Sequence, residues 1–247
     1  MHPIHAVGDI HGQLDQLEAA LDAIERHGEP SAPVVFLGDF VDRGPNSRGV
    51  IELLMRGQTE GRPWICLMGN HDRYVLRFLS NPKYDDPNTS RPLLWTDAPL
   101  GGRQTLASYG VDVSEDRRLE DIHADAHEAI PLSHRHWIAR LPRIHETEAH
   151  IFVHAGLRPG VPLAEQKEDD LVWIRSGFLD SSHDWGRLVV HGHTALDRPQ
   201  LYRNRLNLDG GAGYGRPLLP ALLEGQEVTL LSRRGRSRLH AAADASS

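Results

Sequence analysis

The sequence contains a single cysteine, so no disulfide can form within the chain. Aromatic residues make up only 6% of its 247 residues, and no apolar run approaches the roughly 18 residues that a membrane-spanning helix requires. The N-terminus also lacks the basic and then apolar character of a signal peptide. Positive charge is scarce, with 27 Lys and Arg against 34 Asp and Glu and a formal net charge of −7. We therefore expect a cytoplasmic protein without a broad basic surface for nucleic acid.

The single cysteine, Cys66, shows whether the chain could be a cysteine-dependent phosphatase. Cysteine-dependent phosphatases place an arginine in the pattern C-x5-R, but position 72 is aspartate and Arg73 lies one residue too far. Cys66 also lies within the apolar run 64–68, where a buried and inert thiol is usual. A GxxxxGK[ST] loop is absent as well, so the sequence supports neither a cysteine nucleophile nor a P-loop.

Glycine-rich turns follow three apolar segments in the first third of the chain. The segments 4–7, 34–37 and 64–68 read as buried strands, and the turns after them are GDIHG (8–12), GDFVDRG (38–44) and GNHD (69–72). Each turn places carboxylate, imidazole or amide groups at the carboxyl end of a strand, where open α/β sheets bind their ligands. Such oxygen and nitrogen donors suit a hard or borderline divalent metal. The sequence therefore predicts a metal site.

Two later blocks complete the pattern. The run IFV at 151–153 is followed by HAGL at 154–157, and LVV at 188–190 is followed by HGHT at 191–194. In this order the five blocks resemble the PPP-type metallophosphoesterases, whose motifs are GDxHG, GDxVDRG, GNHE, HxGL and GHT. This family includes serine/threonine protein phosphatases and diadenosine tetraphosphate hydrolases. The one departure is Asp72, which stands where the motif usually has Glu, and we expect it to orient its turn.

The resemblance implies two divalent ions, most simply Mn²⁺, with Fe, Zn or Co as alternatives. It assigns Asp9 and His11 to one ion and Asp39 as the bridge between the two. The second ion is assigned to three further residues, Asn70, His154 and His193. A hydroxide bridging the ions would attack phosphorus in line, with no covalent phosphoenzyme.

The remaining site residues follow from the same resemblance. A phosphoryl group in transfer spreads negative charge over its oxygens, which planar guanidinium groups can pair. Arg43 fits the first phosphate-binding arginine, and Arg175 fits the second through its Trp-x-Arg context. His71 fits the general acid, and Asp42 the carboxylate that orients it.

The apolar pattern predicts an α/β protein, and the resemblance implies two mixed β-sheets packed as a sandwich flanked by helices. Helices are expected over 13–26, around 50–54 and over 74–79. We expect one domain over 1–232, a largely helical cap inserted at 81–133, and a flexible tail at 233–247. The tail carries four arginines, for which a solvated end is favoured over an acidic partner.

Other histidines lie outside the five blocks. His123, His127, His134 and His136 form a cluster at the end of the predicted cap and just after it, and a third metal site there is the alternative to solvent-exposed side chains. His191 is expected to pack or hydrogen-bond beside His193.

The function predicted from the sequence is a two-metal phosphomonoesterase that hydrolyses phosphoserine and phosphothreonine. Its partner would be a phosphorylated protein or peptide, rather than nucleic acid or a membrane. The first alternative is a dinucleoside polyphosphate hydrolase with the same motifs. The second is an inactive phosphate-binding scaffold, which the complete set of ligands, acid and orienting carboxylate disfavours. The sequence makes no prediction of the oligomeric state.

Overall fold

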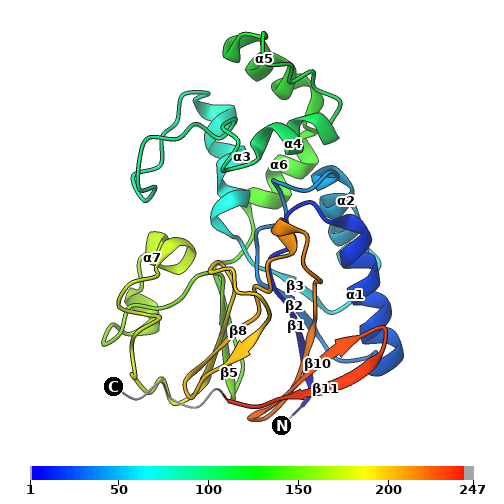
Figure 1. Ribbon diagram of the computed structural model, residues 1–247, viewed down its shortest axis with the longest axis vertical. Coiled ribbons are helices and arrows are strands. Elements are labelled where there is room, and N and C mark those ends of the chain that lie inside the picture. The colour runs from blue at the N-terminus through cyan, green and yellow to red at the C-terminus, as the bar shows by residue number, and fades with distance from the viewer. Residues whose placement is uncertain (1, 242–247) are drawn as a thin grey trace.

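The computed structural model describes residues 2–241, which form two mixed β-sheets (Figure 1). The first sheet has the order β11-β10-β9-β1-β2-β3. Its strands are β1 (Ile4–Val7), β2 (Val34–Phe36), β3 (Trp64–Cys66), β9 (Ala221–Glu224), β10 (Glu227–Ser232) and β11 (Gly235–Leu239). Strands β1, β2 and β3 run parallel, so their carboxyl ends meet at one edge.

The second sheet has the order β4-β5-β6-β8-β7. Its strands are β4 (Ile144–Glu146), β5 (His150–Val153), β6 (Leu188–His191), β7 (Gln200–Leu201) and β8 (Arg205–Asn207). Here β5, β6 and β8 run parallel. Side chains from both sheets, among them Ala6, Leu37, Phe152 and Val190, form one buried apolar cluster. This confirms the predicted α/β fold with two mixed sheets.

Helices cover the outer faces of the two sheets (Figure 1). The helices α1 (Leu14–His27) and α2 (Ser47–Thr59) pack Leu17 and Leu54 into the same core cluster as Phe36 of β2. The helix α7 (Glu168–Trp173) packs Leu171 in a cluster with Val153 of β5. Across residues 2–241, no helix combines the length and apolarity needed to cross a bilayer.

The predicted cap differs from the structure in its boundaries. Residues 81–101 form an irregular loop, and the helices that follow are α4 (Gly102–Ser108), α5 (Leu119–Ala129) and α6 (Leu132–Ala139). The helix before the loop, α3 (Asn70–Ser80), begins four residues earlier than expected. Its first turn therefore contains Asn70 and His71, whose side chains were expected in a turn before the helix.

The prediction of a flexible tail from residue 233 is wrong for its first part. Residues 235–239 form β11, which pairs antiparallel with β10 along five residue pairs. Arg238 of this strand also pairs with Glu227 at 2.6 Å, so its charge has a partner across the hairpin. The rest of the predicted tail, residues 242–247, lies outside the described residues.

Candidate metal centre

The two sheets place the predicted site residues close together at adjoining sheet edges. Asp9 and His11 follow β1, Asp39 follows β2, and Asn70 begins α3 after β3. His154 follows β5 and His193 follows β6 in the second sheet. Each of these residues is buried, with no more than 7% of its surface exposed. The parallel strands therefore place polar donors from both sheets at adjoining edges.

The backbone is strained at several of the predicted site residues. Only five non-glycine residues of the described chain have positive φ, namely His11, Asp39, Asp42, Arg43 and His193, with φ between 49° and 75°. Side chains rarely adopt this left-handed region, and such residues cluster where the structure holds a functional geometry. All five belong to the set of site residues predicted from the sequence.

Asp39 lies between two groups of nitrogen donors. Its Oδ2 is 3.6 Å from His11 Nε2, and its Oδ1 is 3.4 Å from His154 Nε2. Potential ligand atoms converge within 4.8 Å in two clusters that share Asp39, one with His11 and His71 and the other with His154 and His193. This arrangement fits a carboxylate that bridges two ions.

The imidazoles are held in the form that binds a metal. The Nδ1 atoms of His11 and His154 lie 3.0 Å and 2.9 Å from the carbonyl oxygens of Val41 and Leu37, which leaves each Nε2 as the electron-pair donor. Burial lowers the pKa of both side chains and of His193, so the rings are neutral near pH 7. His193 Nε2 is buried and has no hydrogen-bond partner among the described residues. A metal ion would supply the missing partner.

A third buried carboxylate, Asp209, was missed by the sequence analysis. It follows β8 in the turn LDGG and lies close to Asp9, which accepts hydrogen bonds from the backbone N–H of His193 at 3.0 and 3.1 Å. Burial, together with the nearby charges of Asp209 and Asp39, raises the pKa of Asp9 well above its usual range. Three buried carboxylates close together favour bound cations, because cations offset their mutual repulsion. The only signal in the sequence was an aspartate in a glycine turn after an apolar run.

His71 and Asp42 form the pair that the resemblance implied. His71 Nδ1 lies 2.6 Å from Asp42 Oδ2, and its Nε2 lies 3.1 Å from Arg43 Nη2. Because Asp42 occupies Nδ1, only Nε2 of His71 can meet a substrate or an ion. His71 lies in the first ligand cluster beside His11 and Asp39, whereas Asp9, which the resemblance assigned to the same ion, is outside that cluster.

Two further residues hold Asp42 from the cap side. Trp95 Nε1 donates to the Asp42 carboxylate at 2.8 and 3.0 Å, and Thr105 Oγ1 donates to Oδ1 at 2.7 Å. Both residues belong to the 81–133 segment, so this segment contacts the Asp42–His71 pair as well as adjoining the groove. Neither residue could be assigned from the sequence, because no local pattern links them to position 42.

Asp72, which stands where the family motif usually has Glu, hydrogen-bonds the turn after β2 and the turn after β3. Its carboxylate accepts hydrogen bonds from the backbone N–H groups of Gly69, Asp39 and Phe40, all between 2.8 and 2.9 Å. This agrees with the expectation that it orients its turn, and it also fixes the turn after β2. The shorter side chain still reaches all three donors.

Three of the four clustered histidines, His123, His127 and His134, have hydrogen-bond partners within the protein. His123 and His127 of α5 place their Nε2 atoms 3.1 and 2.7 Å from one acceptor, the Leu79 carbonyl oxygen at the end of α3. His134 contacts the Tyr109 hydroxyl at 2.8 Å. No ligand cluster forms there among the described residues, so we read the pair on α5 as capping α3. His191 packs against Phe178 and contacts its neighbour's carbonyl, as expected.

A groove of about 350 Å³ opens over the metal residues. Arg43 and Arg175 line it, together with Trp173, Tyr214 and the loop residues 88–90. Arg43 Nη1 lies 2.6 Å from His11 Nε2, so its guanidinium points into the ligand cluster. Both predicted phosphate arginines thus face the same space as the metal donors.

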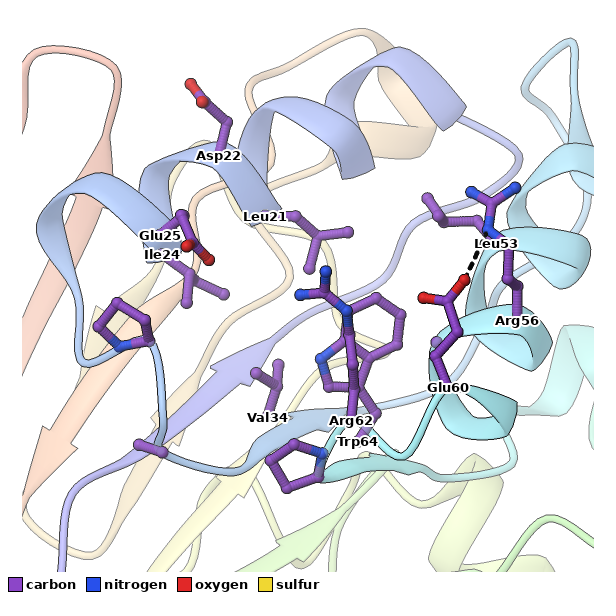
Figure 2. Close-up of a pocket in the computed structure, with 14 residues that line it drawn as sticks. Leu21, Asp22, Ile24, Glu25, Val34, Leu53, Arg56, Glu60, Arg62 and Trp64 are labelled. Atoms are coloured by element: carbon purple, nitrogen blue, oxygen red, sulfur yellow. Dashed lines mark ion pairs between the residues drawn. The ribbon is translucent and has the colours of Figure 1, made fainter.

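Figure 2 shows a second cavity, of about 410 Å³, between α1 and α2. Val34 and Trp64 line it, and they are the first residues of β2 and β3. The cavity therefore lies at the amino ends of these strands, opposite the ligand-binding edge. Its charged groups have both signs, and Arg56 pairs with Glu60 at 4.0 Å. Although this cavity is larger, it contains none of the predicted site residues.

A family model described as calcineurin-like phosphoesterase matches residues 2–202. The chain belongs to the calcineurin-like phosphoesterase family. Members of this family use two divalent metal ions, and the two ligand clusters of this chain match that number. The chain is thus a metallophosphoesterase, and the buried Cys66, whose pKa is raised by burial, is not its nucleophile.

Curated relatives of this family member include two enzymes named bis(5'-nucleosyl)-tetraphosphatase PrpE [asymmetrical]. The one from Halalkalibacterium halodurans is 25% identical over 85% of both chains. The one from Oceanobacillus iheyensis is 23% identical over 87% of this chain and 86% of its own. Among solved structures, a candidate diadenosine tetraphosphatase matches with a TM-score of 0.64 at 23% identity, over 97% of this chain and 95% of its own. The cold-active protein-tyrosine phosphatase of a Shewanella species reaches 0.63 at 15% identity, over 97% and 81%. These two structures establish the fold alone.

Proposed function

We propose that this metallophosphoesterase hydrolyses dinucleoside tetraphosphates. The observation that carries the proposal is the similarity to enzymes of that name along 85% of both chains, which extends across the cap as well as the motifs. This reverses the order predicted from the sequence, in which phosphoproteins came first. The catalytic groove supports the change, because it combines two arginines for phosphates with an exposed aromatic ring, Tyr214.

The residues of the groove would have separate roles in the hydrolysis of a polyphosphate. Two divalent ions, when bound by Asp9, His11, Asp39, Asn70, His154 and His193, would supply a nucleophile from water and neutralise phosphate oxygens. Arg43 and Arg175 would bind the oxygens of the phosphoryl group and hold it in line. His71 would give its Nε2 proton to the leaving oxygen, with Asp42 fixing the ring.

We propose Mn²⁺ as the first ion to test, because the donor set combines carboxylate and amide oxygens with imidazole nitrogens. The test of function compares kcat/KM on diadenosine tetraphosphate with kcat/KM on a phosphothreonine peptide, at one metal concentration and one pH. A preference of tenfold or more for the dinucleotide, which corresponds to about 1.4 kcal/mol of transition-state discrimination, supports the proposal. The opposite preference would overturn it.

Protein phosphatase activity remains the second candidate. The observation in its favour is that Trp173 and Arg175, the block typical of phosphomonoester-cleaving relatives, both line the groove. The same comparison of substrates decides between the two. If neither substrate is turned over by the metal-loaded protein, the inactive scaffold predicted as a third possibility would replace both.

A further inference from the structure

Tyr214 is an exposed aromatic residue at the edge of the catalytic groove. Tyr214 is 61% exposed. Among the described residues, the other large hydrophobic residue with comparable exposure is Leu132, at 66%. Leu132 lies on α6 and is not among the residues that line the groove, whereas Tyr214 is one of them. An exposed ring beside the metal ligands is available to a substrate.

The backbone fixes this ring close to the metal ligands. Tyr214 ends a single 3₁₀ turn, Ala212–Tyr214, flanked by Gly211 and Gly215 at φ 83° and 81°, a conformation that favours glycine. Gly213 presses against His11, because a Cβ at Gly213 would lie 2.5 Å from the His11 ring. The turn therefore cannot move away without leaving the imidazole uncovered. This turn is the short orange helix above the strands in Figure 1.

Arg43 lies over one face of the Tyr214 ring. Its guanidinium carbon is 4.9 Å from the ring centroid, within the range of a cation–π contact. The same guanidinium reaches His11 Nε2 at 2.6 Å, so it links the aromatic ring to the ligand cluster. Given the exposure of the residue, the ring retains surface for a second planar group.

We infer that Tyr214 stacks on a nucleobase of the substrate, with the phosphate attached to that nucleoside held by Arg43. This inference rests on the proposed function and names the residue that would distinguish nucleotides from other phosphate esters. In the proposed complex the metal ions and the two arginines would contact only the phosphate groups, so they would not supply this distinction. An aromatic face can, because every base has a π-face and stacking tolerates all four bases. The ring would therefore favour nucleotides as a class over phosphopeptides.

The experiment compares AMP with inorganic phosphate as ligands of the Mn²⁺-loaded protein. AMP is the shortest probe that carries both a phosphate and a base, and calorimetry gives both dissociation constants without turnover. In Tyr214→Ala the ratio of AMP affinity to phosphate affinity should fall roughly 5- to 150-fold, the range for loss of one stacked base. Tyr214→Phe and Tyr214→Trp should retain the ratio, since they keep the ring. Leu132→Ala is the matched control for removing an exposed hydrophobic side chain, and its ratio should equal that of the wild type.

Two outcomes would overturn the inference. Unchanged affinities for both AMP and phosphate in Tyr214→Ala would mean that no base contacts the ring. Equal weakening of AMP and phosphate would mean that the ring acts only by positioning Arg43, and Tyr214→Leu would then behave like Tyr214→Ala for both ligands. Failure of the proposed function gives a different result, because the wild type would not hydrolyse diadenosine tetraphosphate. If it does hydrolyse it, KM for that substrate should rise in Tyr214→Ala in proportion to the lost AMP affinity.

Discussion

The indole Nε1–H of Trp95 donates to both carboxylate oxygens of Asp42, at 2.8 and 3.0 Å. Trp95 is 1% exposed and packs on Phe78 of α3, with ring centroids 5.0 Å apart. A buried residue of the irregular loop 81–101 therefore holds the carboxylate that orients His71. The cap therefore contacts the Asp42–His71 pair through Asp42, in addition to bordering the groove.

Trp95→Phe should lower kcat while leaving metal content intact. The ring keeps its packing against Phe78, but Asp42 loses one hydrogen-bond donor and retains Thr105 and His71. Loss of a hydrogen bond to a charged group costs about 1.5–3 kcal/mol, or roughly a 10- to 150-fold lower kcat if the whole loss falls on the transition state. Steady-state kinetics and metal analysis check this. Unchanged kcat would show that Thr105 suffices to hold Asp42.

Asp39→Ala should lose both metal ions, because its two oxygens face the two groups of nitrogen donors. Mass spectrometric metal analysis after dialysis should give close to zero ions per chain, and chelation of the wild type should abolish hydrolysis until Mn²⁺ is added back. Asp22→Ala, which removes a half-buried aspartate of α1 that pairs with Arg26 away from the metal residues, is the control and should bind two ions as the wild type does. Two ions retained in Asp39→Ala would refute the bridging role.

His71→Asn should affect substrates according to their leaving groups. An alkyl phosphate needs a proton on its departing oxygen, whereas a nitrophenyl phosphate does not, and general acid catalysis contributes roughly 10²- to 10⁴-fold. We therefore expect a much larger fall in kcat for the alkyl phosphate, with metal content unchanged. An equal fall on both substrates together with loss of an ion would instead make His71 a metal ligand.

Asp72→Asn should destabilise the protein, because the carboxylate accepts three backbone N–H groups and an amide offers only one oxygen. Leaving buried donors unpaired costs about 1–3 kcal/mol, which urea denaturation would show as a lower midpoint. Asp197→Asn, at a position whose side chain is 92% exposed, provides the matched control. Wild-type stability in Asp72→Asn would mean that the turns hold without this side chain.

His5 should make stability depend on pH. Its Nε2 accepts the backbone N–H of Glu29 at 3.2 Å, and burial lowers its pKa below the value of 6.5 expected in the unfolded chain. The unfolded chain therefore binds the proton more readily, and this contribution to stability is present above pH 6.5 and lost as pH falls below it.

His5→Gln keeps an acceptor for Glu29 but cannot take up a proton. Between pH 6.5 and 5.5 the variant should lose less unfolding free energy than the wild type, by at most about 1 kcal/mol. Urea midpoints at the two pH values measure the difference. Identical losses in both proteins would show that His5 is protonated equally well in the folded state.

The sequence by itself determined the strands that end in glycine turns and the residue types at those turns. Apolar runs and turn glycines act through neighbouring residues, so β1, β5 and β6 and the ligand positions after them could be predicted from short stretches. It also led to the family, which the match over residues 2–202 confirmed. The assignment of each ligand to an ion stays a prediction.

Only the tertiary structure decided which distant residues support the site. Trp95 meets Asp42 across 53 positions and Gly213 meets His11 across about 200, because burial of apolar faces brings the cap and the late turn over the metal edge. Asp209 reaches Asp9 through the same packing, and β11 formed where a loose end was expected because β10 offered it an unpaired edge. Such contacts depend on how whole elements pack, which no local pattern of residues encodes.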